Sequence, residues 1–131
     1  VYHEMVASGL FDFVGHPDLP KKFGIRPSGD LGRFYRPVIG AMERADLAFE
    51  LNTAGLRKDC REIYPEASFL RMAFEAGVPC LMNSDAHAVS ELGADFEFGL
   101  RSLRAAGYRE VCRFERRQRR MVPLPEEGVR A

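Results

Sequence analysis

The chain has 131 residues, 46% of them hydrophobic and 29% charged, which is the composition of a globular domain and not of a disordered segment. Its 19 basic and 19 acidic residues give a net charge of zero, so no overall charge attracts nucleic acid or an acidic membrane surface. Cys60, Cys80 and Cys112 are too widely spaced for a disulfide framework or a zinc knuckle. We therefore expect a cytoplasmic protein with reduced thiols and no membrane segment.

Four short apolar segments are typical of buried strands, and the segments beside them have the apolar spacing of helices. The predicted strands cover residues 10–15, 47–51, 78–82 and 108–114. Crossovers of helical length join parallel strands, so this alternation predicts an α/β fold with four parallel strands and covering helices. Such an arrangement is half of an α/β barrel, in which functional groups gather at the carboxyl ends of the strands.

Glycines and polar residues set the expected limits of the helices. The helix after the first strand is expected to place Phe34 on its inner face. Ser90 is expected to cap the last helix, with Leu92 facing inward and Gly107 at its end. The charged run over residues 113–120 is expected to be a solvated edge strand, followed by a loose C-terminus.

Asp85-Ala86-His87 follows the third predicted strand. Residues at i and i+2 of an extended backbone point to the same side, so both side chains can reach one metal cluster. A carboxylate beside a neutral imidazole suits zinc, manganese or iron, and Asn83 and Ser84 can orient such ligands. The alternative is a turn at a helix entry in which Asp85 acts as the cap. Spacing alone leaves both interpretations open.

His16 follows the first predicted strand, a position that commonly holds functional groups in barrels. It is either a metal ligand or a structural hydrogen-bonding residue. His3 lies on the first predicted helix without a ligand-type neighbour, and we expect it at the surface.

Residues 52–58 follow the second predicted strand and contain a glycine and two adjacent cations. Arg57 is the better candidate for a phosphate because its planar guanidinium binds phosphate oxygens in a bidentate manner. Lys21 and Lys22, near His16, are further basic candidates. The alternative is that these cations are solvated loop residues.

Three segments occur in the order and spacing of the later motifs of PHP-family histidinol-phosphate phosphatases. They are GHPDLPKKFG at 15–24, ELNTAGLRKDCREIYP at 50–65 and NSDAHAVSELG at 83–93. Residues 108–124 resemble the closing strand of that family. The chain, residues 1–131, therefore resembles the C-terminal part of one PHP metal-dependent phosphoesterase domain.

The resemblance implies the C-terminal portion of a distorted (β/α)7 barrel that binds two or three divalent metal ions (Zn, Mn or Fe). It implies that His16, Asp85 and His87 are metal ligands, and that Asp85 and His87 take part in catalysis. It places Arg57 at a substrate-phosphate position and Lys22 near another basic one. The implied reaction is hydrolysis of L-histidinol phosphate, a small-molecule phosphate monoester, to L-histidinol and phosphate in histidine biosynthesis.

The H-x-H motif, a further His and a Glu that precede these motifs in the family are absent from the sequence. We therefore expect a cut chain that binds metal weakly and is inactive by itself. One alternative is another PHP phosphoesterase acting on nucleotides or nucleic acid, against which the N-T-A-G-L-R-K and E-I-Y-P segments argue. The other is a non-catalytic module that binds nucleic acid through residues 113–120. Glu115 interrupts that run and the chain is neutral, so we expect no nucleic-acid partner.

Overall fold

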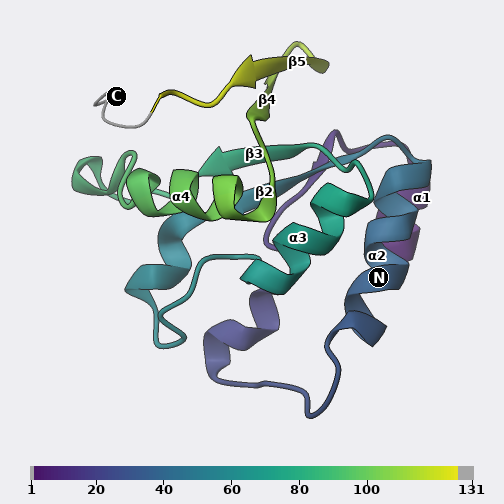
Figure 1. The fold of residues 1–131 in the computed structure, drawn as a ribbon, viewed down its shortest axis with the longest axis horizontal. Coiled ribbons are helices and arrows are strands. Elements are labelled where there is room, and N and C mark those ends of the chain that lie inside the picture. Colours follow the sequence, from purple (N-terminus) through teal and green to yellow (C-terminus); the bar gives the residue numbers. More distant parts are fainter. Residues whose placement is uncertain (1, 127–131) are drawn as a thin grey trace.

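A computed structural model describes residues 2–126. The side chain of His3 is not among the described parts, so the prediction that it lies at the surface falls outside them. The elements, with η for a 3-10 helix, are α1 (Tyr2–Ala7), β1 (Phe13–Val14), η1 (Leu19–Phe23), α2 (Gly32–Arg44), β2 (Ala48–Asn52), η2 (Thr53–Arg57), α3 (Ala67–Glu75), β3 (Cys80–Asn83), η3 (Val89–Glu91), α4 (Phe96–Ala106), β4 (Glu110–Glu115) and β5 (Gln118–Pro123). They form a mixed α/β structure (Figure 1). None of these helices has the length and apolar composition that a membrane span requires.

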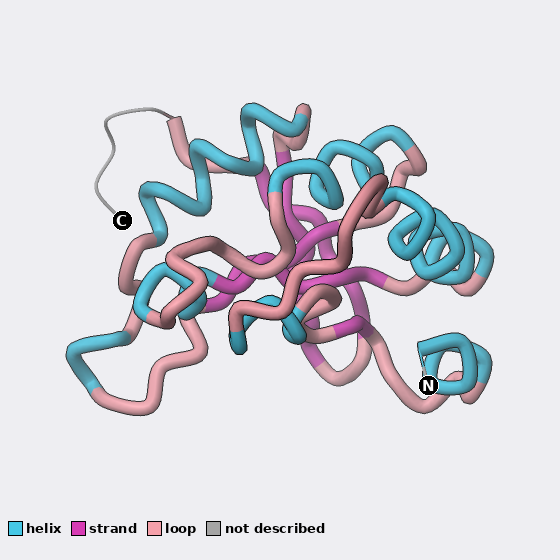
Figure 2. Tube along the Cα trace, turned by 90° about the horizontal axis from the view of Figure 1, so that it is seen from below, coloured by secondary structure: helices cyan, strands magenta, loops and turns pink. Residues whose placement is uncertain are grey.

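A parallel sheet with the strand order β1-β2-β3 forms the centre of the molecule, and helices lie around the strands (Figure 2). Every residue of the middle strand β2 is buried, because this strand has a neighbour on each edge and packed layers on both faces. On the face covered by helices, Phe49 packs edge-to-face on Phe69 at 5.4 Å between ring centroids. On the other face, Ala48 and Leu81 pack against Cys112 of β4. The three predicted parallel strands are thus confirmed.

The prediction of a fourth parallel strand was wrong. Strand β4 pairs with β5 in an antiparallel hairpin, and these two strands form a separate sheet. Arg116 and Arg117 turn the chain between the pair Glu115 and Gln118, with φ values of 50° and 66°. Hairpin turns of this kind usually contain glycine or asparagine, so two arginines gave no turn signal in the sequence. Strand β5 itself is mostly exposed and lacks a clear apolar alternation.

Two arginines of the charged run hold this hairpin against the loops that precede β1 and β2. The Arg117 guanidinium lies 3.1 Å from the Asp12 carboxylate. The Arg119 guanidinium pairs with the Asp46 carboxylate at 2.6 Å and donates a hydrogen bond to the backbone carbonyl oxygen of Asp46 at 2.9 Å. The run is therefore a solvated strand edge, as expected, and part of its positive charge is neutralised within the chain.

The last helix begins later than predicted. Strand β3 leads into a loop that ends at Asp95, and α4 starts only at Phe96, so Ser90 does not cap this helix. The prediction that Leu92 faces inward was also wrong, because Leu92 is 70% exposed. The loop is fixed by polar contacts that periodicity does not reveal, since Thr53 donates a hydrogen bond to the carbonyl of Ala94 at 2.7 Å.

The inner face of α2 also differs from the prediction. Phe34 was expected inside and is 46% exposed, whereas Ile39 and Met42 form the buried face of α2.

Gly107 ends α4, as predicted, with a φ of +117° that L side chains rarely adopt. A methyl group at this position would also overlap the ring of Phe74. We expect Gly107→Ala to lower the free energy of unfolding by at least ~1–2 kcal/mol, the cost of the left-handed backbone alone. Gly77→Ala is the matched control, because Gly77 has a φ of +71° and open space around it. Urea unfolding should show a larger loss for Gly107→Ala, and equal losses would contradict the role of Phe74.

Candidate functional site

Polar side chains from all three parallel strands meet at the carboxyl edge of the sheet. His16 follows β1 by two residues, Glu50 lies in β2, and Asp85 follows β3 by two residues. Parallel strands bring their carboxyl ends to the same edge, which explains the convergence of segments distant in sequence. His16 Nε2 lies 3.4 Å from Asp85 Oδ2. The expected proximity of His16 and Asp85 is therefore observed.

Glu50 is the centre of this cluster, and sequence analysis did not identify it as a site residue. It is 5% exposed, and its carboxylate accepts hydrogen bonds from Asn83 Nδ2 at 2.6 Å, from Asn52 Nδ2 at 3.3 Å and from His16 Nδ1. A carboxylate buried in the middle of a strand is costly unless it is hydrogen-bonded, and here it is. The signal in the sequence was the single charged residue in the apolar segment Leu-Ala-Phe-Glu-Leu.

The Glu50 hydrogen bond determines which nitrogen of His16 carries a proton. An ionised carboxylate only accepts hydrogen bonds, so His16 Nδ1 is the donor and Nε2 of the neutral ring keeps its lone pair. This bond raises the pKa of His16, helped by the charges of Glu50 and Asp85 and opposed by burial. Burial works to raise the pKa of Glu50, but hydrogen bonds from His16 and Asn83 outweigh it and the pKa is lowered. The pair thus favours an ionised Glu50.

His16 and Asp85 both have left-handed backbone conformations, with φ values of 46° and 49°. Such values are uncommon outside glycine, although Asn, Asp and His adopt them more readily than other residues, and surrounding contacts hold them in place. At Asp85 this conformation also overturns the expectation of an extended Asp85-Ala86-His87 segment. The residue bends the chain, so the alternation of side chains along an extended strand does not apply to Asp85 and His87.

His87 is exposed on the loop after β3, and its observed contacts are with the Asp85 backbone and Glu91. Its Nδ1 is 2.8 Å from the backbone carbonyl of Asp85, and its backbone N–H donates to the Glu91 carboxylate at 2.8 Å. Within residues 2–126, no group of three or more His, Cys, Asp or Glu side chains is arranged to hold a metal ion. The structure therefore shows two of the three predicted ligands together, and the third on a loop beside them.

Arg57 ends η2, directly after β2, where its position was predicted. Its guanidinium lies 2.9 Å from the Asp95 carboxylate and donates to the carbonyl oxygen of Ser84 at 2.8 Å. Ser84 is the neighbour of Asp85, so the cation lies beside the cluster. It connects η2 to both ends of the loop between β3 and α4.

Two adjacent lysines of η1 have different environments. Lys22, the residue predicted to bind substrate, is half-buried with its Nζ 5.8 Å from the centre of the Phe23 ring, and no contact with His16 or Asp85 is observed among the described residues. Lys21 is 5% exposed and pairs with Asp18 Oδ2 at 2.7 Å. Burial raises the pKa of Asp18, opposed by the charge of Lys21. Sequence alone did not distinguish the two lysines.

Comparisons with known proteins place this chain among relatives with one shared name. It is 39% identical over 116 residues to a "probable histidinol-phosphatase" of Deinococcus radiodurans, which covers 88% of this chain and 43% of that protein. A "probable histidinol-phosphatase" of Schizosaccharomyces pombe is 26% identical over 68 residues, covering 52% of this chain and 22% of that protein. No family model matches the chain.

A solved structure gives the same result. The crystal structure of the "putative histidinol phosphatase hisK" from Listeria monocytogenes aligns with a TM-score of 0.60 and 28% identity, covering 74% of this chain and 42% of that chain. The chain thus belongs to a family of hydrolases whose named members are phosphatases. In particular, its resemblance to histidinol-phosphatases, first indicated by three sequence motifs, is confirmed over most of its length. It spans less than half the length of each of these relatives.

Proposed function

We propose that residues 1–131 form the C-terminal part of a PHP-type, metal-dependent phosphatase domain that hydrolyses L-histidinol phosphate to L-histidinol and phosphate. The observation that carries this proposal is the convergence of His16, Glu50 and Asp85 from three parallel strands. It occurs in a chain whose relatives bear the name histidinol-phosphatase. The three strands supply one section of the barrel, and its remaining strands lie outside these residues.

The residues at the strand ends fit a divalent cation. His16 Nε2 and Asp85 Oδ2 are both hydrogen-bond acceptors, and two acceptors 3.4 Å apart gain from a cation between them. Two ligand atoms with bonds of ~2.0–2.1 Å to one tetrahedral ion lie about 3.4 Å from each other, the separation found here. His16 and Asp85 would therefore hold one ion together. His87, on the loop after β3, would be the third ligand that the resemblance implies.

Metal ions at this site would supply a Lewis acid that activates water and neutralises charge on the phosphate. The chain's own residues orient the reactants. Glu50 keeps the proton on Nδ1 of His16, as carboxylates commonly do for metal-binding histidines, so that Nε2 keeps its lone pair, 3.4 Å from Asn52 Nδ2. Arg57 would bind oxygens of the substrate phosphate and stabilise the charge that they gain. Lys22 would approach the same phosphate as a second cation.

The substrate assignment is tested with the full-length protein that contains residues 1–131. Phosphate release is measured from histidinol phosphate and from nucleoside monophosphates, with manganese or zinc added. We expect the higher kcat/KM for histidinol phosphate. A higher value for the nucleotides would favour the alternative of another PHP phosphoesterase.

Histidine biosynthesis in the cytoplasm would be the setting of this reaction, which agrees with free thiols at Cys60, Cys80 and Cys112.

Arg57 provides a prediction for the phosphate site. We expect Arg57→Ala to lower kcat/KM by about 10- to 100-fold, the value of one or two lost hydrogen bonds to a charged group. Arg57→Lys should cause a smaller loss, because an ammonium keeps the positive charge. Some loss should remain, because an ammonium cannot reproduce the bidentate contact. Asp95→Asn is the matched control, since it breaks the ion pair at 2.9 Å and keeps the guanidinium. A loss in Asp95→Asn as large as in Arg57→Ala would instead assign Arg57 to loop structure.

A further inference from the structure

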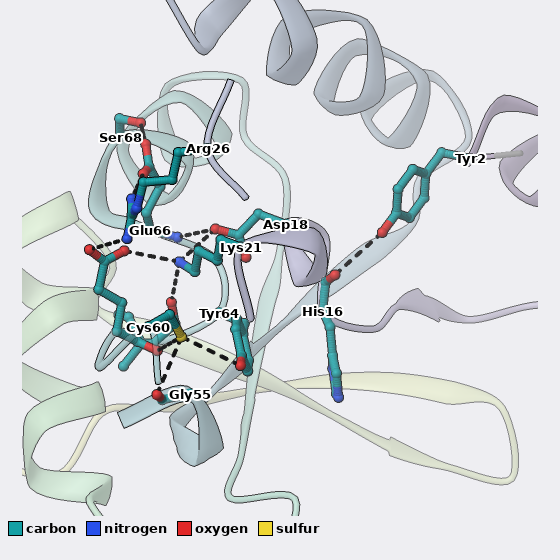
Figure 3. A network of polar contacts seen from close by, with 12 residues as sticks. Tyr2, His16, Asp18, Lys21, Arg26, Gly55, Cys60, Tyr64, Glu66 and Ser68 are labelled. Carbon is teal, nitrogen blue, oxygen red and sulfur yellow. Dashed lines mark hydrogen bonds and ion pairs between the residues drawn. The ribbon is translucent and has the colours of Figure 1, made fainter. Parts of the chain in front are cut away.

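Tyr64 stands beside the candidate site and was not among the predicted functional residues. Tyr64 is 2% exposed. Its ring stacks on the His16 imidazole with 5.9 Å between ring centroids and 13° between the ring planes. Lys21 Nζ lies 5.4 Å from the centroid of the same ring. Figure 3 shows Tyr64 between Lys21 and His16. The ring is thus in contact with a buried cation as well as with a candidate metal ligand.

The backbone of Tyr64 is fixed to the end of β2. Its N–H donates to the Asn52 carbonyl at 2.9 Å, and its own carbonyl accepts from the Asn52 N–H at 2.6 Å. Gly55 packs so closely that a methyl group there would overlap both the Tyr64 ring and the carbonyl oxygen of Glu62. The phenol oxygen is 3.6 Å from the Cys60 sulfur. The ring therefore projects from a rigid support and has little freedom to rotate.

Lys21 supports this arrangement from the other segment. Its ammonium donates a hydrogen bond to the carbonyl of Ile63, the residue before Tyr64, at 2.6 Å, and it pairs with Asp18. Asp18 Oδ2 also accepts the Glu66 N–H at 2.8 Å. These contacts attach the turn that carries His16 to the segment that carries Tyr64. The two stacked rings are consequently held at one separation.

His16 needs such a support because one hydrogen bond does not define the plane of a ring. The bond from Nδ1 to Glu50 fixes one edge of the imidazole, and the contact between Nε2 and Asn52 Nδ2, at 3.4 Å, is too long to fix the other edge firmly, so the ring can still tilt. A metal ion is bound by the lone pair in the ring plane, so rotation would misdirect Nε2. A neighbouring aromatic face restricts this freedom, because stacked rings attract each other at the centroid separation of 5.9 Å found here.

We propose that Tyr64 is a positioning residue that fixes the imidazole plane of His16 for metal coordination, with Lys21 holding Tyr64 in place. The proposal rests on the proposed function, in which His16 is a metal ligand. It adds a residue that makes no contact with metal or substrate itself. The requirement is for a flat ring, because the ring face contacts His16 while the phenol oxygen lies 3.6 Å from the Cys60 sulfur.

The test compares Tyr64→Phe, which keeps the ring, with Tyr64→Leu, which removes it, in the full-length protein. Manganese affinity is measured by calorimetry, and the His16 tautomer is read from nitrogen NMR of the metal-free protein at alkaline pH. We expect Tyr64→Leu to weaken manganese binding about 10-fold, as loss of a ligand-supporting contact does. We also expect it to mix the two tautomers, because a tilted ring weakens the Nδ1 hydrogen bond to Glu50 that sets the tautomer. Tyr64→Phe should match the wild type in both measurements.

A purely structural Tyr64 would leave the tautomer unchanged in every soluble variant, and this result would overturn the proposal. If Tyr64→Leu does not fold, Tyr64→Met replaces it, because methionine fills similar space without a ring. Equal manganese affinity in the ringless variant and in Tyr64→Phe would overturn the proposal as well. These measurements do not use hydrolysis. A protein that fails to hydrolyse histidinol phosphate but shows both expected changes would refute the proposed function alone.

Discussion

Lys21→Met should lower the free energy of unfolding by about 3–5 kcal/mol, because the substitution leaves the Asp18 carboxylate buried without its cation. Asp18 is itself buried, and its Oδ1 has no hydrogen-bond partner among the described residues. The ion pair with Lys21 at 2.7 Å therefore provides its main compensation, together with the Glu66 N–H. Urea unfolding monitored by circular dichroism measures the change.

Lys22→Met is the matched control for this prediction. Lys22 is the next residue, is only half-buried, and lies over an exposed phenylalanine ring, so its loss should change stability by at most ~0.5 kcal/mol. The double variant Asp18→Asn with Lys21→Met should recover part of the loss, because it removes both charges. Similar stability of the Lys21→Met and Lys22→Met proteins would show that the buried pair is unimportant.

Glu50→Gln is expected to weaken metal binding by about 10- to 100-fold, the usual effect of losing a partner that orients a metal-binding histidine. The substitution keeps the shape of the side chain and removes the charge that holds the proton on Nδ1 of His16. It also places an amide NH2 among the donors of Asn52 and Asn83, so that one donor loses its acceptor. kcat/KM for histidinol phosphate should fall with metal affinity.

Calorimetric titration with manganese tests this directly, and Glu43→Gln on the exposed surface of α2 serves as the charge-matched control. The control should bind manganese as the wild type does. If Glu50→Gln also binds normally, then the cluster at the strand ends is a structural hydrogen-bond network and not part of a metal centre.

Hydrophobic patterning was sufficient to predict the parallel strands, because their burial is recorded in short apolar segments. It also placed His16, Arg57 and Asp85 after strands, and parallel pairing then brings such positions together. Glu50 was missed because one charged residue inside an apolar strand has no partner visible in the sequence. Its partners, His16 and Asn83, are 34 and 33 positions away.

Two other differences have local backbone causes. The left-handed φ of Asp85 directs the loop away from the extended path on which the His87 prediction depended. The turn at Arg116 and Arg117 uses residues that rarely form hairpin turns, so the fourth predicted strand was assigned to the wrong sheet. In both cases tertiary contacts enforce a conformation that local preferences disfavour.

The hairpin contacts lie at the amino end of the sheet, and the candidate site lies at the carboxyl end. The two ends therefore differ in their sensitivity to ionic strength. Dissolved ions screen the exposed Arg117 pair with Asp12 over ~8–10 Å at physiological concentration, but they screen the buried hydrogen bonds of Glu50 much less. Added salt should thus weaken the pair of Arg117 with Asp12 more than the cluster of His16 and Glu50, while the packing of Cys112 on the sheet keeps the hairpin in place.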